Sequence, residues 1–331
     1  MSFPAFQERK AMTLSLKPLL LAGALAATLP ALAMADATIS LPDAGFAPEG
    51  ISHDTSGNLY VGSLTQGRIA KISLKTGEIT EFAPAGANGL VTVVGVHVEG
   101  DQTFACSSDP GIGALTGTSA PALVAFDTDT GAPSGRYPLP EGGMFCNDIA
   151  ALPDGTILVT DSFVPRIYAL KPGADQLEVW LDDSRFAGEG FNLNGIAYDD
   201  GAVFVARYNT GTLHQIDLGS HGEAGTITDL KMSAEIHGAD GLTALGGRRF
   251  LIVEGGGLHA GARGALLGAT VSEGAVNLST IADDLNVPTT ATVIGKTAYV
   301  VEGQLDHLFD PSAGPADPYR ILAIELPETF Q

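Results

Sequence analysis

The sequence has little positive charge and few long hydrophobic runs. Only 17 residues are Lys or Arg, against 38 Asp or Glu, and the formal net charge is −21. No cluster of basic residues offsets this acidity, so the surface repels phosphate backbones and a nucleic-acid partner is not expected. After residue 35 no apolar segment is long enough to predict a membrane span. We expect the protein to be a monomer that binds a small-molecule substrate.

Several catalytic motifs are also missing. There is no G-x-S-x-G nucleophile elbow, no H-E-x-x-H zinc motif and no P-loop. Gly111-Ile112-Gly113 has no predicted helix behind it, so it does not indicate a dinucleotide site. These absences argue against a serine hydrolase of the α/β type, a zinc peptidase and a nucleotide-binding enzyme.

The one long apolar run lies near the N-terminus. Basic residues between Arg9 and Lys17 precede an apolar stretch over residues 18–32, and small residues follow it up to Ala35. This order is typical of a secretory signal peptide. We therefore predict that residues 1–35 are removed near Ala35 and that the protein is exported, to the periplasm or the medium. An uncleaved anchor helix is the alternative.

Cysteine is scarce, with Cys106 and Cys146 as the two examples. Export places both in an oxidising compartment, where a single disulfide is the expected state. The alternative is a pair of buried free thiols.

What the chain does contain is a repeat of short β-type runs. In one unit, residues 195–198 lead through an Asp-Asp-Gly turn to a second run at residues 203–207. Six such units recur about 45–50 residues apart, a spacing typical of propeller blades. They begin at residues 50, 95, 148, 195, 241 and 290.

We therefore predict an all-β fold for residues 36–331, a single six-bladed β-propeller. Third and fourth strands follow in most units, with turn residues between them. The last unit is one strand short. We expect residues 37–41 to supply its missing outer strand, because closing the ring in this way removes an exposed sheet edge.

The residue before each repeat start is the strongest functional signal. In a propeller the innermost strands line the axis, so their first residues meet at one mouth of the channel. Four of the six carry hard oxygen ligands that suit a divalent cation, above all Ca²⁺, with Zn²⁺, Mn²⁺ or Mg²⁺ as alternatives. Asn-Gly and Asp-Gly are also ordinary turn dipeptides, which is the competing interpretation. The six residues are Glu49, Val94, Asn147, Asn194, Asp240 and Thr289.

At these motifs the sequence resembles the senescence marker protein/gluconolactonase family and, more distantly, diisopropyl fluorophosphatase. The resemblance covers about residues 40–326 and rests on Pro48-Glu49-Gly50, Asn147-Asp148-Ile149, Asn194-Gly195-Ile196-Ala197 and Asp240-Gly241-Leu242. It implies a six-bladed propeller whose metal ligands are Glu49, Asn147, Asn194 and Asp240. It also implies hydrolysis of lactones or organophosphates, with Asp240 as base or nucleophile. Val94 and Thr289 depart from a full ring of ligands.

The second strands are expected to end at the same mouth. Their last residues are Ser63, Ser107, Asp161, Arg207, Glu254 and Glu302. We predict that Arg207 binds a substrate oxygen and that Asp161, Glu254 or Glu302 shares proton transfer with Asp240. These residues are equally well explained as solvated rim positions. His259 and His307, in long loops at this mouth, are more readily explained as loop histidines than as a proton shuttle.

The sequence thus predicts an exported, divalent-metal-dependent hydrolase that acts on a lactone or a related small ester. A propeller that binds Ca²⁺ without catalysis and serves as a binding or scaffold protein would use the same four ligands. A lyase or isomerase that uses the metal to stabilise an enolate is a third possibility.

Overall fold

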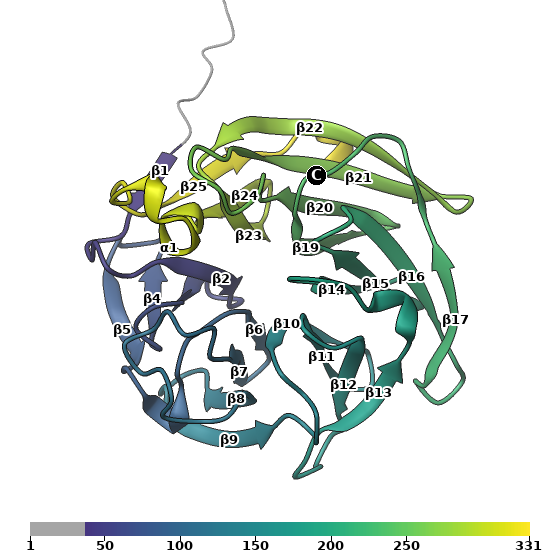
Figure 1. Ribbon diagram of the computed structural model, residues 1–331, viewed down its shortest axis with the longest axis horizontal. Coiled ribbons are helices and arrows are strands. Elements are labelled where there is room, and N and C mark those ends of the chain that lie inside the picture. Colours follow the sequence, from purple (N-terminus) through teal and green to yellow (C-terminus); the bar gives the residue numbers. More distant parts are fainter. Residues whose placement is uncertain (1–36) are drawn as a thin grey trace, which may run out of the picture. The chain divides into compact units, whose positions relative to one another are not determined.

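A computed structural model describes residues 37–331 and places them in six β-sheets around a central axis (Figure 1). The predicted six-bladed propeller is confirmed. In blades 1 to 4 the strands run antiparallel from the axis outward in chain order. The first three blades consist of β2 (Pro48–His53), β3 (Asn58–Ser63), β4 (Ile69–Ser73) and β5 (Ile79–Ala83); β6 (Val96–Glu99), β7 (Gln102–Ser107), β8 (Ala122–Asp127) and β9 (Pro133–Pro138); and β10 (Cys146–Ala151), β11 (Ile157–Asp161), β12 (Arg166–Leu170) and β13 (Glu178–Asp182).

Of the other three blades, blade 4 keeps this plan and blades 5 and 6 vary it. Blade 5 gains a fifth strand, β18, which pairs parallel with β22. Blade 6 takes its outer strand from the start of the described chain. Their strands are β14 (Leu193–Asp199), β15 (Ala202–Arg207), β16 (Thr212–Leu218) and β17 (Ala224–Asp229); β19 (Ala239–Gly246), β20 (Arg249–Glu254), β21 (Gly264–Ser272), β22 (Ala275–Leu285) and β18 (Lys231–Met232); and β23 (Pro288–Ile294), β24 (Thr297–Glu302), β25 (Arg320–Glu325) and β1 (Ala37–Ser40).

The ring closes as predicted. β1 pairs antiparallel with β25, so that Ala37 lies opposite Ala323 and Ser40 opposite Arg320. The predicted signal peptide lies outside the described residues. No helix among residues 37–331 is long and apolar enough to cross a membrane.

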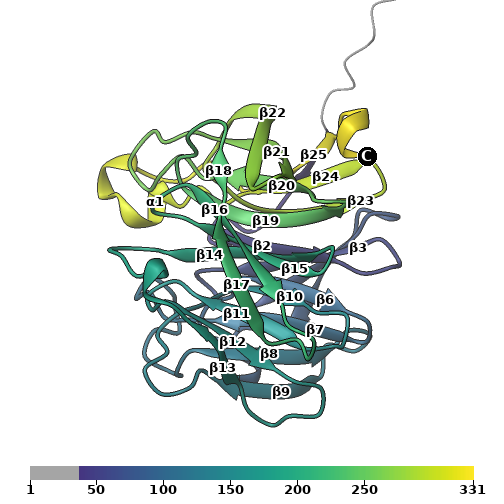
Figure 2. The same ribbon diagram turned by 90° about the vertical axis from the view of Figure 1, so that its right-hand side faces the viewer.

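Helical segments are short and lie in the connections. Among residues 37–331 the one α-helix, α1 (Asp306–Phe309), follows the second strand of blade 6 and projects from one end of the blades (Figure 2). Single 3₁₀ turns cover η1 (Ala87–Gly89), η2 (Ser184–Phe186), η3 (Pro311–Ala313) and η4 (Glu328–Phe330).

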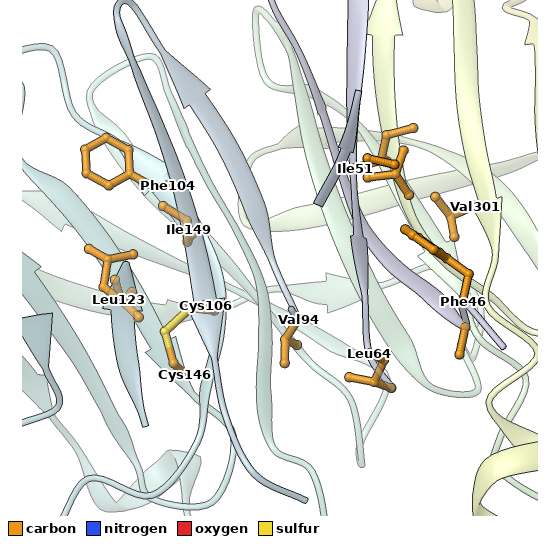
Figure 3. Close-up of a cluster of buried hydrophobic side chains, with 14 of the residues drawn as sticks. Phe46, Ile51, Leu64, Val94, Phe104, Cys106, Leu123, Cys146, Ile149 and Val301 are labelled. Atoms are coloured by element: carbon orange, nitrogen blue, oxygen red, sulfur yellow. A yellow bond between two sulfur atoms is a disulfide. The ribbon is translucent and has the colours of Figure 1, made fainter. Parts of the chain in front are cut away.

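The second strand of each blade is buried on both faces, which explains its continuous apolar sequence. All five residues of β11, for example, are buried. The turn that leads into β11 needs a left-handed residue, and Gly155 supplies it with φ of 85°. Apolar side chains then pack between neighbouring blades. Figure 3 shows part of a larger cluster that runs from blade 6 through blades 1, 2 and 3.

Candidate metal centre

The four predicted ligands line one cavity at one mouth of the propeller axis. Each is the second residue of its strand, in β2, β10, β14 and β19 of four different blades. Each side chain is almost fully buried, between 3% and 6% exposed. We call Glu49, Asn147, Asn194 and Asp240 the ligand ring. The sequence interval between its members is about 50–100 residues, so only the blade repeat brings them together.

A β-bulge at each ligand directs its side chain to the axis. On blade 1, Pro48 pairs with Ser63 and Ile51 with Val61, so three steps on β2 oppose two on β3. The same one-residue shift falls at Asn147, Asn194 and Asp240. Bulges of this kind re-aim side chains next to active sites. The repeat therefore carries a bulge that presents the second residue of the innermost strand to the channel.

The glycines that follow the ligands have a packing role rather than a turn role. Gly50 and Gly195 lie inside strands, and neither has positive φ. A Cβ at Gly50 would lie 2.2 Å from the Val94 carbonyl oxygen, and one at Gly195 would lie 2.4 Å from that of Asp240. Each glycine lets its strand approach the backbone at the start of a neighbouring blade. The Glu-Gly, Asn-Gly and Asp-Gly pairs are therefore explained by close packing and not by turns.

Two ligand oxygens are buried without a partner. Within residues 37–331, neither Glu49 Oε2 nor Asn147 Oδ1 accepts a hydrogen bond. Buried polar atoms are rarely left unpaired, so such atoms point to a missing ion or water. Thr289, at the equivalent position of blade 6, instead donates from Oγ1 to the Glu49 carbonyl oxygen at 2.8 Å and supports the ligand strand.

The electrostatics of the ring favour a cation. Burial, followed by the nearby charges of Asp240 and Asp148, raises the pKa of Glu49 well above its usual value. Burial and Asp148 do the same to the pKa of Asp240, although a hydrogen bond from the Asn194 side chain acts in the opposite direction. Burial also raises the pKa of Asp148 to about 6. A dication would offset this clustered negative charge.

The donor set fits a hard cation. Two carboxylates and two amides offer oxygen ligands, the chemistry that Ca²⁺ prefers. Within residues 37–331 no group of three or more His, Cys, Asp or Glu side chains is arranged to hold a metal. The identity of the ion stays a prediction, with Ca²⁺ ahead of Zn²⁺, Mn²⁺ and Mg²⁺.

Ser162 fixes the orientation of the Asn147 amide. Asn147 Nδ2 donates to Ser162 Oγ at 2.8 Å, and Ser162 Oγ donates to the Leu193 carbonyl oxygen at 2.6 Å. Because the amide nitrogen is engaged there, the unpaired Oδ1 is the atom free to bind an ion. Sequence reasoning missed Ser162, which stands one residue after the strand end that drew attention.

The disulfide predicted between Cys106 and Cys146 is confirmed. It joins β7 of blade 2 to β10 of blade 3, with a Cα–Cα distance of 5.1 Å, and lies inside the apolar cluster of Figure 3. Cys146 directly precedes Asn147. The covalent bond therefore fixes the start of the strand that carries this ligand.

The six residues that end the second strands share a different role. Each hydrogen-bonds the segment that leads into the first strand of its own blade. Ser63 Oγ donates to the Phe46 carbonyl oxygen, and Ser107 Oγ accepts from the Val91 N–H at 2.9 Å. We call the set the clasp ring: Ser63, Ser107, Asp161, Arg207, Glu254 and Glu302.

The four charged members of the clasp ring follow the same rule. Asp161 accepts from the N–H groups of Met144 and Phe145 at 2.8 and 3.0 Å. Arg207 donates to the Ala187 carbonyl oxygen at 2.7 Å. Glu254 accepts from the His237 N–H at 2.7 Å. Glu302 accepts from the Asn286 N–H at 2.8 Å and from Arg320.

None of these clasp residues lines the cavity above the ligand ring, and neither do His259 and His307. His307 lies on α1, with Nδ1 3.0 Å from the Gly314 carbonyl oxygen. The catalytic parts proposed for Arg207, Asp161, Glu254 and Glu302 stay predictions.

The walls of the cavity are mostly apolar and were not found from the sequence. The cavity occupies about 410 Å³, its open mouth included. In most blades the wall residue comes shortly after the second strand, a recurrence that could have been read from the repeat. The wall residues are Leu64, Val94, Pro110, Phe145, Phe191, Tyr208, Leu258, Leu305 and Phe309.

Comparison with known proteins supports the fold. No protein-family model matches the sequence, and no curated protein matches it. Among solved structures, a gluconolactonase from Xanthomonas campestris is 15% identical, with a TM-score of 0.60 over 88% of this chain and 89% of that one. A putative gluconolactonase is 14% identical, with a TM-score of 0.59 over 88% of this chain and 93% of the other.

A third similar structure has a different activity. A catalytically inactive histidine variant of virginiamycin B lyase from Staphylococcus aureus, solved with quinupristin, is 15% identical to this chain. Its TM-score is 0.56 over 88% of this chain and 99% of that one. At these identities the likeness concerns the fold, which hosts hydrolases and lyases alike, so function has to be argued from the site.

Proposed function

We propose that the protein is a divalent-metal-dependent hydrolase of lactones or related small esters. One observation carries the proposal. Four oxygen-bearing side chains from four blades line one cavity, and two of their buried oxygens have no partner within residues 37–331. The similarity in fold to gluconolactonases agrees with this choice.

Glu49, Asn147, Asn194 and Asp240 would hold the ion. When bound, a dication supplies Lewis acidity: it polarises a carbonyl oxygen and lowers the pKa of a water molecule. Hydrolysis adds water across the acyl C–O bond. The water oxygen bonds to the carbonyl carbon, the ring C–O bond breaks, and one proton passes to the leaving oxygen.

The residues of the chain contribute the rest. Asp240 lines the cavity and would accept the proton of the attacking water. Tyr208 also lines the cavity, and burial together with Asp240 raises the pKa of its hydroxyl, which therefore stays protonated and can donate a hydrogen bond to the substrate. Phe145, Phe191 and Phe309 shield the reacting group from bulk water.

The test measures base-consuming hydrolysis of a lactone and aryl-ester panel by the purified protein, with Ca²⁺ and with a chelator. Turnover that disappears with chelator and returns with metal is the expected result. Asp240→Asn should then lower turnover by about 10²–10⁴-fold. Calorimetry on the same variant at saturating Ca²⁺ separates loss of the base from loss of the ion.

Absence of turnover on every ester, despite tight Ca²⁺ binding, would contradict the proposal. It would favour a non-catalytic, calcium-binding propeller. Analysis of products separates hydrolysis from elimination, since a lyase forms a double bond and takes up no water. The lyase interpretation has less support, because no histidine lines the cavity.

We also propose that the protein is exported and monomeric. The N-terminal pattern of basic and apolar residues and the Cys106–Cys146 disulfide support export, since disulfides persist in oxidising compartments. N-terminal sequencing of the protein from its host tests cleavage near Ala35, and light scattering tests the monomer.

A further inference from the structure

Apart from the ligand ring itself, the cavity is lined almost entirely by apolar side chains. Thirteen residues line the cavity, and besides the four ligands only Tyr208 among them is polar. No Lys, Arg or His contributes to the lining. Within residues 37–331 the Tyr208 hydroxyl has no hydrogen-bond partner, so it is available to a ligand. The other lining residues are Leu64, Val94, Pro110, Phe145, Phe191, Leu258, Leu305 and Phe309.

An aromatic cluster forms one side of the cavity. Phe191 is at its centre, with ring-centroid distances of 5.5 Å to Phe145, 6.1 Å to Phe309 and 6.2 Å to Tyr208. Phe163 packs on both Phe191 and Phe145, at 5.0 and 4.8 Å. The cluster draws residues from blades 3, 4 and 6 and so belongs to the mouth rather than to the core of any one blade.

The apolar surface continues outside the cavity. Three large hydrophobic residues are exposed within residues 37–331: Met144 at 55%, Phe163 at 37% and Val179 at 45%. Two of them adjoin the cluster, since Met144 precedes Phe145 and Phe163 contacts it. Val179 lies on the outer strand β13 of the same blade. Met144 and Phe163 therefore extend the apolar wall of the cavity to the protein surface.

This lining suits some lactones and not others. A sugar lactone carries several hydroxyls, and those held against the apolar wall would lose water without gaining a partner, because Tyr208 and the ligands are the polar side chains of the lining. An alkyl or aryl substituent would instead gain roughly fourfold in affinity for each methylene buried. An anionic substituent would also find no Lys, Arg or His in the lining to pair with.

We propose that the substrates are neutral lactones or esters with an apolar alkyl or aryl substituent, which packs on Phe145, Phe191 and Phe309 and extends over Phe163 and Met144. This inference rests on the proposed hydrolase function. It assigns the acyl carbonyl to the ligand ring and the substituent to the aromatic cluster.

The experiment has two arms on the same protein loaded with Ca²⁺. The first compares kcat/KM for γ-lactones with alkyl substituents from methyl to hexyl, and for glucono-δ-lactone. The second measures binding of the matched γ-alkyl lactams by calorimetry, which needs no turnover. We expect kcat/KM and lactam affinity to rise about fourfold per methylene over the first few carbons. Gluconolactone should be at least 100-fold poorer than the hexyl lactone.

Two variants locate the apolar contact. Phe163→Ala should reduce the gain per methylene in both arms, because it removes the exposed part of the cluster. Val179→Ala removes a comparably exposed residue from the same blade, away from the mouth, and should leave the series unchanged.

The outcomes separate the two proposals. A flat or falling series, with gluconolactone as the best substrate, would overturn the apolar substrate class while the hydrolase function survives. A rising series unaffected by Phe163→Ala would also contradict it. If no lactone is hydrolysed but lactam affinity rises with chain length and Phe163→Ala weakens it, the apolar specificity holds and the hydrolase proposal fails.

Discussion

The ligand ring and the clasp ring lie at the same mouth of the propeller and recur with the same repeat, yet their side chains differ in whether their polar atoms are hydrogen-bonded. In the ligand ring, buried oxygens of Glu49 and Asn147 have no partner within the described residues. In the clasp ring every member has a hydrogen-bond partner in the segment that enters its own blade, as Asp161 has at Met144. A position that repeats is therefore not by itself a functional position.

The state of the buried polar atoms distinguishes the two rings. A buried group that is fully hydrogen-bonded contributes to the fold, whereas an unpaired one costs free energy unless something outside the chain satisfies it. Substitutions in the ligand ring are thus expected to change metal affinity, whereas substitutions in the clasp ring are expected to change mainly the order of the loops and the stability of the fold. The predictions below test this difference, in order of their expected effect on the metal centre.

Glu49→Gln should have the largest effect. The substitution keeps the shape of the side chain and removes one of the two ligand charges. We expect Ca²⁺ affinity, measured by calorimetry, to fall on the order of 10³-fold, since ligand charge moves calcium affinities over several decades. Glu325→Gln, at an exposed position of β25, removes the same charge from the surface and serves as the control. Equal affinities in the two variants would exclude Glu49 as a ligand.

Ser162→Ala should have the next largest effect. Without the hydroxyl, the Asn147 amide loses the acceptor that fixes its orientation. Changes of this type beyond the ligands typically cost about 10–100-fold in metal affinity. Ser108→Ala is the matched control: Ser108 Oγ is also buried and donates to the Cys146 carbonyl oxygen at 2.9 Å, but it contacts no ligand side chain. Similar losses in both variants would mean that the serine affects only the fold.

Reduction of the Cys106–Cys146 bond should affect stability more than metal binding. The two residues are 40 apart in sequence, and closing a loop of that size stabilises the fold by about 4 kcal/mol in the chain-entropy account. Urea unfolding of oxidised and reduced protein, with thiol content verified, measures this difference without changing any side chain. Ca²⁺ affinity should fall less than in Ser162→Ala, because Ser162 still holds the Asn147 amide. Unchanged unfolding would contradict the prediction.

Much of the fold was predictable because it repeats. The blades, the closing strand at residues 37–40 and the disulfide follow from period, turn residues and cysteine count. The convergence of the ligand ring followed from the phase of Glu49, Asn147, Asn194 and Asp240 within that period. The added strand β18 of blade 5 was not foreseen, because a two-residue strand leaves no periodic pattern.

The surroundings of the site were less accessible to sequence reasoning. A bulge is a shift in strand register, and the residue types of Pro48-Glu49-Gly50 do not predict such a shift. The fate of a polar side chain at a strand end depends on which backbone groups the next loop presents, as Arg207 shows with Ala187. Phe145, Phe191 and Phe309 read as core residues one by one. Only the packed structure shows that they share a cavity wall.

Glu254→Gln should have the smallest effect, and it decides most directly between the two roles of a clasp residue. Glutamine keeps an oxygen that can accept the His237 N–H bond, so the free energy of unfolding should change by less than about 1 kcal/mol. Turnover and Ca²⁺ affinity should stay within roughly threefold of the parent protein, against the 10²–10⁴-fold loss expected for removal of a catalytic acid or base. Glutamine cannot carry a proton to or from the substrate. A loss of turnover comparable to that of Asp240→Asn, at unchanged stability and metal affinity, would therefore place Glu254 in proton transfer and show that a clasp residue can also act in catalysis.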